Sequence, residues 1–167
     1  ILLWTNRGTE SRVNIEFEYL ADRPEDTPLV VLWWYSVWAD RMVPNLEKNV
    51  EQLAASLSKD DLPIHILAMA DGVPVGTAAL KLQEVEELFP DKQYWLGSVY
   101  VAEHLRGMKI ASKLSLKIVE IAQEWGLPHL YLQTQNLQGG LYTGLGWEPI
   151  EQFRFKHEDA LLMRKEL

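Results

Sequence analysis

The chain has 167 residues, of which 47% are hydrophobic and 24% charged, and it contains seven tryptophans and no cysteine. This size and composition predict one globular domain over residues 1–167 and argue against intrinsic disorder. The lack of cysteine excludes disulfide bonds, cysteine-based metal sites and an acyl-cysteine intermediate. The formal net charge of −8 opposes non-specific binding to nucleic acid, which is itself negative, and makes a cationic partner the more natural expectation.

The first residues of the sequence are not expected to be a signal peptide. Ile1–Trp4 is apolar, but no basic segment precedes it and no small-residue cleavage pattern follows it. The longest apolar run, Leu29–Ala39, has about half of the ~20 residues that a membrane-spanning helix needs. We therefore expect no membrane segment and a cytoplasmic protein.

One strand and two helices are predicted in the first third of the chain. Val13–Leu20 alternates apolar and polar residues, the pattern of a half-buried strand. Thr27–Arg41 is rich in tryptophan and has no glycine or internal helix breaker, which favours a helix. Asn45 is a suitable N-cap for a second helix that reaches about Ser58. The apolar stripe of that helix is expected to contain Leu46, Val50, Leu53, Ala54 and Leu57.

A hairpin and a third strand follow. Pro63–Ala70 and Val73–Leu82 are apolar runs joined by Asp71-Gly72, a dipeptide typical of tight hairpin turns. The acidic residues 84–93 predict a loop, and Tyr94–Val101 predicts a strand after it.

The remaining elements begin with a long helix, from just after Gly107 to about Trp125, that ends at Gly126. Its buried face is expected to contain Ile110, Leu114, Ile118, Ile121, Ala122 and Trp125, with Lys109, Lys113 and Lys117 on another face. The chain is completed by a strand at His129–Gln133, a short helix around Leu137–Leu145, and two strands near Glu148–Phe155 and Ala160–Lys165.

This order of elements predicts a mixed α/β fold. The long helix between the strands at 94–101 and 129–133 implies a parallel crossover, whereas the Asp71-Gly72 hairpin requires an antiparallel pair. We expect one mixed sheet of six to seven strands, flanked by helices.

The segment from Val99 to Ala111 has the pattern of an anion site. It joins a strand, a short basic loop and the first turn of the long helix, where unpaired N–H groups and a partial positive charge are exposed. Between residues 103 and 117, four basic residues stand against one acidic residue. A diphosphate group fits these features.

This segment also resembles the signature of the GNAT superfamily of acyl-CoA-dependent N-acetyltransferases, a strand followed by Arg/Gln-x-x-Gly-x-Gly/Ala at the start of a helix. The residues that match are Arg106, Gly107, Ile110 and Ala111. Lys109 stands at the usual middle glycine, and Glu103 stands where the family often has proline.

The resemblance continues downstream. Leu130–Thr134, Asn136 and Leu141–Trp147 are similar to the family's next strand and its "LYxxLGF/W" element, so the motifs cover roughly residues 94–147. The resemblance implies the GNAT fold, in which two parallel strands splay apart and the acyl-pantetheine arm lies between them.

The resemblance also implies a role for each motif residue. The amides of Val99 and Val101 would bind the pantetheine arm and the thioester oxygen. Tyr142 would be the general acid that protonates the leaving thiolate, and Asn136 would contact the coenzyme. The diphosphate would bind at the turn made by Arg106, Gly107, Met108, Lys109, Ile110 and Ala111. The implied reaction is direct attack of a primary amine on acetyl-CoA in a ternary complex, without a metal.

The amine must lose a proton before it attacks. At pH 7 this costs roughly 4 to 5 kcal/mol for a lysine-like amine and about 1 kcal/mol for an N-terminal amine. Trp95 stands at the strand position where some family members have a catalytic glutamate. His104, Glu84, Glu86 or Glu87 could accept the proton through water, and the sequence does not choose among them.

Alternative interpretations stay open. The chain could be a non-catalytic acyl-CoA-binding module on the same fold, or a transferase for a longer acyl group. Tyr142 could be a core tyrosine, and Asn136 a helix cap. Because Trp33 and Trp34 are adjacent and cannot share one helix face, one of them is a candidate for a substrate cleft or an interface. The acceptor could be a small molecule or a peptide, and a homodimer is compatible with the sequence.

Overall fold

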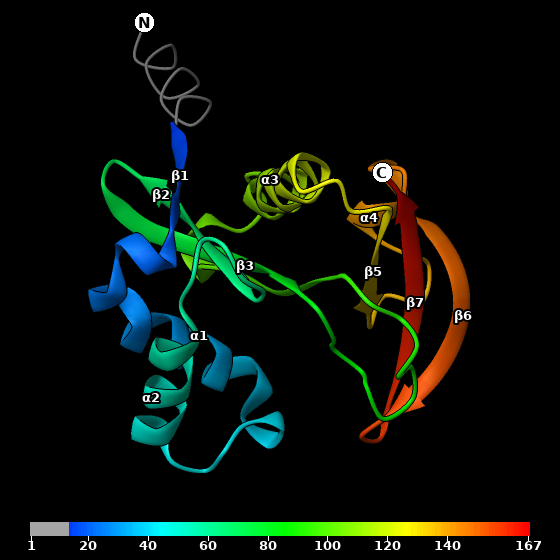
Figure 1. The fold of residues 1–167 in the computed structure, drawn as a ribbon, viewed down its shortest axis with the longest axis horizontal. Helices are drawn as coiled ribbons and strands as arrows, with labels where there is room; N and C mark the ends of the chain where they lie inside the picture. The colour runs from blue at the N-terminus through cyan, green and yellow to red at the C-terminus, as the bar shows by residue number, and fades with distance from the viewer. Residues whose placement is uncertain (1–13) are drawn as a thin grey trace, which may run out of the picture.

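The computed structural model describes residues 14–167 (Figure 1). The strands are β1 (Ile15–Tyr19), β2 (Ile64–Ala70), β3 (Val73–Lys81), β4 (Trp95–Val101), β5 (His129–Thr134), β6 (Glu148–Phe155) and β7 (Glu158–Glu166). The α-helices are α1 (Thr27–Trp38), α2 (Leu46–Ser56), α3 (Ile110–Glu124) and α4 (Leu141–Gly144). Short 3-10 turns are η2 (Leu20–Asp22), η3 (Pro24–Asp26), η4 (Ala39–Arg41) and η5 (Glu103–Leu105). The N-terminal segment Ile1–Trp4 and the predicted strand start at Val13 lie outside the described residues.

The strands form one sheet in the order β1-β2-β3-β4-β5-β7-β6. β4 and β5 are parallel, whereas the other neighbouring pairs are antiparallel. Figure 1 shows α3 on one side of this sheet and α1 with α2 on the other. The predicted mixed α/β fold with six to seven strands is therefore confirmed.

Local sequence signals explain several of these elements. Asp71 and Gly72 both have positive φ, 50° and 78°, as the tight turn between β2 and β3 requires. The Asn45 side chain accepts a hydrogen bond from the Lys48 backbone N–H, so it caps α2 as predicted. Gly126, with a φ of 71°, ends α3.

The core is divided between the two faces of the sheet. Alternation along β2 directs Ile64, Ile66 and Ala68 into the cluster beneath α3, and Leu67 and Met69 into the cluster beneath α1 and α2. A third cluster consists of Val85, Phe89, Trp95, Tyr131 and Leu162. The sheet thus separates the packing that supports α3 from the packing that supports α1 and α2.

Some predicted details were wrong. Helix α1 ends at Trp38 and continues only as η4, and the short helix predicted at 137–145 is the single turn α4. On α2, Leu46 and Ala54 are exposed. Asn49 is buried instead, and its amide is satisfied there because Nδ2 donates to Val43 O (2.6 Å) and to Asn45 O (3.0 Å). The indole of Trp125, expected on the buried face of α3, is 38% exposed because it lies at the end of that helix. Within residues 14–167, no helix has both the length and the apolar character that a membrane span needs.

Candidate active site

The candidate site is a cleft of about 850 Å³ at the place where β4 and β5 separate. The two strands are in register only at Trp95 and Tyr131 within the described chain, and the Tyr131 N–H donates to Tyr94 O (2.8 Å). Beyond that point, Leu96–Val99 and Leu132–Asn136 line the cleft from its two sides. The splayed parallel pair that the sequence predicts is present.

A bulge in β4 shapes one side of this cleft. Ser98 has a φ of 55°, and β4 advances by three residues from Gly97 to Tyr100 while its partner β3 advances by two, from Ala79 to Thr77. The extra residue takes peptide groups out of the ladder with β3. Val99, which follows the bulge, lines the cleft as the predicted amide donor should.

The far end of β4 leaves another amide available. The Ala102 N–H donates to Val75 O (2.7 Å), so the preceding N–H, that of Val101, points away from β3 towards the side that β5 has left. The Val101 carbonyl points the same way and accepts from Arg106 Nε (3.0 Å). The Val101 side chain is buried and is not part of the cleft lining. Val101 can therefore offer a ligand only its backbone N–H group.

The turn before α3 exposes a run of backbone N–H groups. Gly107 and Lys109 have positive φ, 86° and 63°, and the first hydrogen bond into the helix runs from Lys113 N to Lys109 O (3.1 Å). The N–H groups of Ile110 and Ala111 therefore precede the first helical bond. Nothing lies within 4 Å of a Cβ placed at Gly107, so the turn is open to a ligand.

The side chains of this turn have different surroundings. Ile110 is 2% exposed, and Met108 and Ala111 pack against the cluster beneath α3, so these three residues offer mainly backbone groups. Arg106 braces the end of β4 through Val101 O, and its guanidinium lies 5.3 Å from the centre of the Tyr100 ring. Lys109 is exposed and adds positive charge beside the free N–H groups. Backbone donors and cationic side chains at one turn fit a diphosphate.

Tyr142 lies on α4 and lines the cleft. Its ring packs edge-on against Trp147, with centroids 6.2 Å apart. Burial raises the pKa of the Tyr142 hydroxyl above its ordinary value, a hydrogen bond with Ser115 opposes that shift, and the negative charge of Glu84 adds to it. The hydroxyl is therefore protonated at neutral pH, which is the form that a general acid requires.

Asn136 lines the cleft but already has a local structural role. Its Oδ1 accepts from the Gln138 N–H (3.0 Å), and its own N–H donates to Thr134 Oγ1 (3.2 Å). A Cβ added at Gly140 would stand only 2.9 Å from the Asn136 Nδ2, so only glycine fits at position 140 without a shift. Asn136 therefore shapes the turn between β5 and α4, and its amide nitrogen has no hydrogen bond to the described residues.

The structure separates the four candidate bases. Glu84 and Glu87 line the cleft, whereas Glu86 and His104 are exposed and lie outside its lining. Glu84 lies over β4 because position 97 is glycine, where a Cβ would collide with the Glu84 carboxylate. Its Oε1 is 3.5 Å from Lys81 Nζ, which also donates to Ser98 Oγ (3.3 Å).

Trp95, at the strand position of the family's catalytic glutamate, has a packing role. Its indole is fully buried in the third cluster, and its Nε1 donates to Lys92 O (2.7 Å).

Sequence reasoning missed His65 as a cleft residue. His65 is 5% exposed, its Nδ1 has no hydrogen-bond partner among the described residues, and its ring centroid is 5.5 Å from that of Trp34. Burial, and then the positive charge of Lys81, lowers the pKa of His65 from 6.5 to about 4. The available signal was a single histidine within the apolar run of β2.

Trp34 lines the cleft, while Trp33 stacks on Tyr100, which bears out the expectation that the two adjacent rings have different surroundings.

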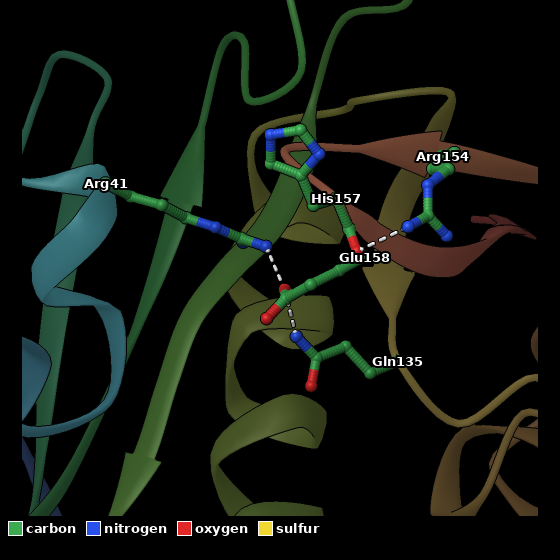
Figure 2. A network of polar contacts seen from close by, with 5 residues as sticks. All are labelled: Arg41, Gln135, Arg154, His157 and Glu158. Carbon is green, nitrogen blue, oxygen red and sulfur yellow. Dashed lines mark hydrogen bonds and ion pairs between the residues drawn. The ribbon is translucent and has the colours of Figure 1, made fainter.

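A polar bridge joins distant parts of the chain beside the cleft (Figure 2). Arg41 Nη2, from η4, is 2.6 Å from Glu158 Oε2 at the start of β7, and Gln135 donates to the same carboxylate oxygen. All three residues line the cleft. Arg154 in Figure 2 lies apart from this bridge and bonds to His157 O (3.0 Å) and Asp159 Oδ1 (2.9 Å). No local pattern could predict a pair separated by 117 residues.

Comparison with known proteins identifies the family. The sequence matches the acetyltransferase (GNAT) family over residues 19–147, which includes β2 to β5 and α4. The chain belongs to the GNAT family. A comparison with curated proteins gives no match.

Solved structures of GNAT proteins share this fold. A ribosomal-protein-alanine N-acetyltransferase from Brucella melitensis is 23% identical, with a TM-score of 0.69 over 92% of this chain and 99% of that chain. A GNAT acetyltransferase from Streptococcus pneumoniae is 18% identical, with a TM-score of 0.67 over 92% and 99%. An aminoglycoside 6′-acetyltransferase type Ii is 16% identical, with a TM-score of 0.69 over 92% and 96%. At these identities the likeness establishes the GNAT fold, and the acceptors named are those of the other proteins.

The described residues also bear on metal binding. Within residues 14–167, no group of three or more histidine, aspartate or glutamate side chains is arranged to hold a metal ion.

Proposed function

We propose that this protein transfers an acetyl group from acetyl-CoA to a primary amine by direct attack in a ternary complex. The observation that carries this proposal is the cleft between β4 and β5, which has Val99 and Tyr142 on its lining, with the free backbone edge of Val101 just beyond it. In the GNAT family this separation receives the acyl arm of the coenzyme. When bound, the thioester supplies the electrophilic acetyl carbon.

The turn before α3 supports coenzyme binding. Its free N–H groups at Ile110 and Ala111 and the charge of Lys109 suit the diphosphate, and the open space at Gly107 allows close approach to the backbone. Arg106 holds the end of β4 against this turn. The Val99 and Val101 N–H groups are fixed donors for the pantetheine arm and the thioester oxygen, and fixed donors need little reorganisation as charge develops.

Proton transfer is assigned to two side chains of the cleft. Glu84 accepts a proton from the incoming ammonium, directly or through water, because it lies over β4 beside the bulge at Ser98. Tyr142 donates a proton to the leaving thiolate. Its raised pKa keeps that proton in place at neutral pH, and the negative charge of Glu84 contributes to the shift.

Two measurements test the proposal. Calorimetry with acetyl-CoA should show saturable binding below millimolar concentration, and thiol release should rise when amines of different size and pKa are added. Binding without thiol release for any amine would support the non-catalytic alternative. No binding at millimolar acetyl-CoA would overturn both interpretations.

A further inference from the structure

The cleft extends from β4 beneath α1 and α2, and His65 marks this extension. His65 pairs with Ala79 on β3, and Ala79 pairs with Gly97 on β4, so the three residues form one row across the sheet. Side chains in such a row share a face. The Glu84 carboxylate lies over Gly97, so the row places His65 at one end and Glu84 at the other, with only the small Ala79 side chain between them. The span is roughly 10 Å, which corresponds to two strand spacings.

Two buried polar atoms at this end have no partner among residues 14–167. They are the His65 Nδ1 and the Trp34 Nε1, on rings whose centroids are 5.5 Å apart. An indole N–H can only donate, whereas a neutral imidazole has one nitrogen that accepts. A buried polar group without a partner is costly, so such groups in native proteins usually mark a role.

Several groups of α1 and α2 at this end are apolar or already bonded. Val31 and Leu53 are buried side chains of α1 and α2 that line this end. From α2, the Asn49 amide donates to Val43 O and Asn45 O, and the Ser56 hydroxyl donates to Leu53 O (2.8 Å). Two basic residues of the cleft lining are paired, Lys81 with Glu84 and Arg41 with Glu158. The buried side chains that line this end, Val31 and Leu53, carry no charge.

We propose that Trp34 and His65 bind an uncharged hydroxyl or carboxamide at the far end of an acceptor amine, the indole N–H donating to it and the imidazole accepting from it. This inference rests on the proposed function and names its acceptor class: an amine whose apolar body, about the length of a phenylethyl group, separates the reacting nitrogen from one neutral polar group. The roughly 10 Å span from His65 to Gly97 sets that length.

Tyramine and phenethylamine are the matched probes, because they differ by one hydroxyl group. Calorimetry in the presence of coenzyme A gives the two dissociation constants, and thiol release gives the two kcat/KM values. We expect tyramine to be preferred about tenfold or more, since phenethylamine leaves both buried atoms unpaired. His65→Phe and Trp34→Phe should each reduce the preference to about threefold or less, chiefly by weakening tyramine. Trp125→Phe, at the exposed end of α3, is the matched control and should keep the preference.

A measurement on the unaltered protein covers the case in which a variant fails to fold. The assigned indole N–H resonance of Trp34 should shift on addition of tyramine more than on addition of phenethylamine. Equal binding of the two amines, binding of neither, or a preference that survives both substitutions would overturn the inference. A binding preference without any acetyl transfer would leave the inference standing and refute the proposed function, whereas transfer without preference would do the reverse.

Discussion

Tyr131 lies opposite Trp95 at the closed end of the cleft, with ring centroids 5.5 Å apart, and within the described chain this is the one register pair between β4 and β5. Both side chains are buried in a cluster with Val85, Phe89 and Leu162. The point where the strands separate is therefore fixed by aromatic packing.

Tyr142→Phe should lower kcat by about a hundredfold, because the variant has no proton to give to the leaving thiolate. Binding of acetyl-CoA should be unchanged, since the ring and its contact with Trp147 remain. Steady-state thiol release and calorimetry measure the two quantities. Tyr35→Phe, on α1 and outside the cleft lining, is the control. Unchanged turnover in Tyr142→Phe would remove this residue from the mechanism.

Glu84→Gln should lower kcat/KM by about a hundredfold for strongly basic amines and by much less for amines of pKa near ~8, which lose their proton more easily. A pH profile of kcat/KM for both amine classes measures the effect. Glu86→Gln is a close control, because Glu86 is exposed and outside the cleft lining. An equal loss for both classes of amine would indicate a structural role for Glu84.

The turn before α3 gives a pair of stability predictions of opposite sign. Gly107→Ala should lower the free energy of unfolding by about 1 kcal/mol, through backbone conformation alone, because φ is 86° and no atom lies near the new Cβ. Lys109→Gly should raise it by a few tenths of a kcal/mol, since Lys109 now holds the left-handed conformation that glycine adopts freely. Urea unfolding measures both. A neutral Gly107→Ala would show that this turn is not left-handed in solution.

Stability should fall in mild acid because of His65. Its pKa is lowered from 6.5 to about 4 in the folded protein, so the unfolded chain binds more protons between these two values. The stability that comes from burying the neutral ring is fully present above pH 6.5 and is lost as the pH falls to about 4, a change of about 3 kcal/mol. Unfolding at several pH values measures it. His65→Phe should remove most of this slope, whereas His104→Asn, on the surface, should keep it.

The bridge between Arg41 and Glu158 should affect acceptor access more than stability. Both side chains are partly exposed, so Arg41→Ala should change the free energy of unfolding by less than about 1 kcal/mol. It should raise kcat/KM for bulky amines, because it removes a side chain that joins η4 to β7 beside the cleft. Arg154→Ala, whose pair with Asp159 lies outside the cleft lining, is the control. Equal effects of the two substitutions would contradict a role for the bridge in access.

Local signals in the sequence predicted most of the fold. Asp71-Gly72 determines its own turn, Asn45 caps its own helix, and the apolar face of α3 repeats with the period of a helix. The motif residues are similarly local: the turn at Gly107 and the short α4 that carries Tyr142 depend on backbone conformations that a few adjacent residues encode. That is why the family signature could be recognised without a structure.

The parts of the site that were missed depend on packing between distant segments. Glu84 stands out among four candidate bases only because the loop after β3 folds over Gly97. His65 could be recognised as a site residue only from its contact with Trp34, which lies on a different element, α1. The bulge at Ser98 changes which residues face the cleft, and nothing in the adjacent residues indicates it. Such features require the three-dimensional arrangement.

The two sides of the sheet have separate cores, and this arrangement has a consequence for how the protein can diversify. Met108 and Ala111, in the turn before α3, rest on the cluster beneath that helix, whereas Trp34 packs with Leu20, Val30 and Leu53 on the opposite face. Substitutions that reshape the α1 and α2 layer leave the packing under the turn intact. The proposed acceptor end of the cleft can therefore change by substitution in one layer without disturbing the turn that is proposed to bind the coenzyme in the other.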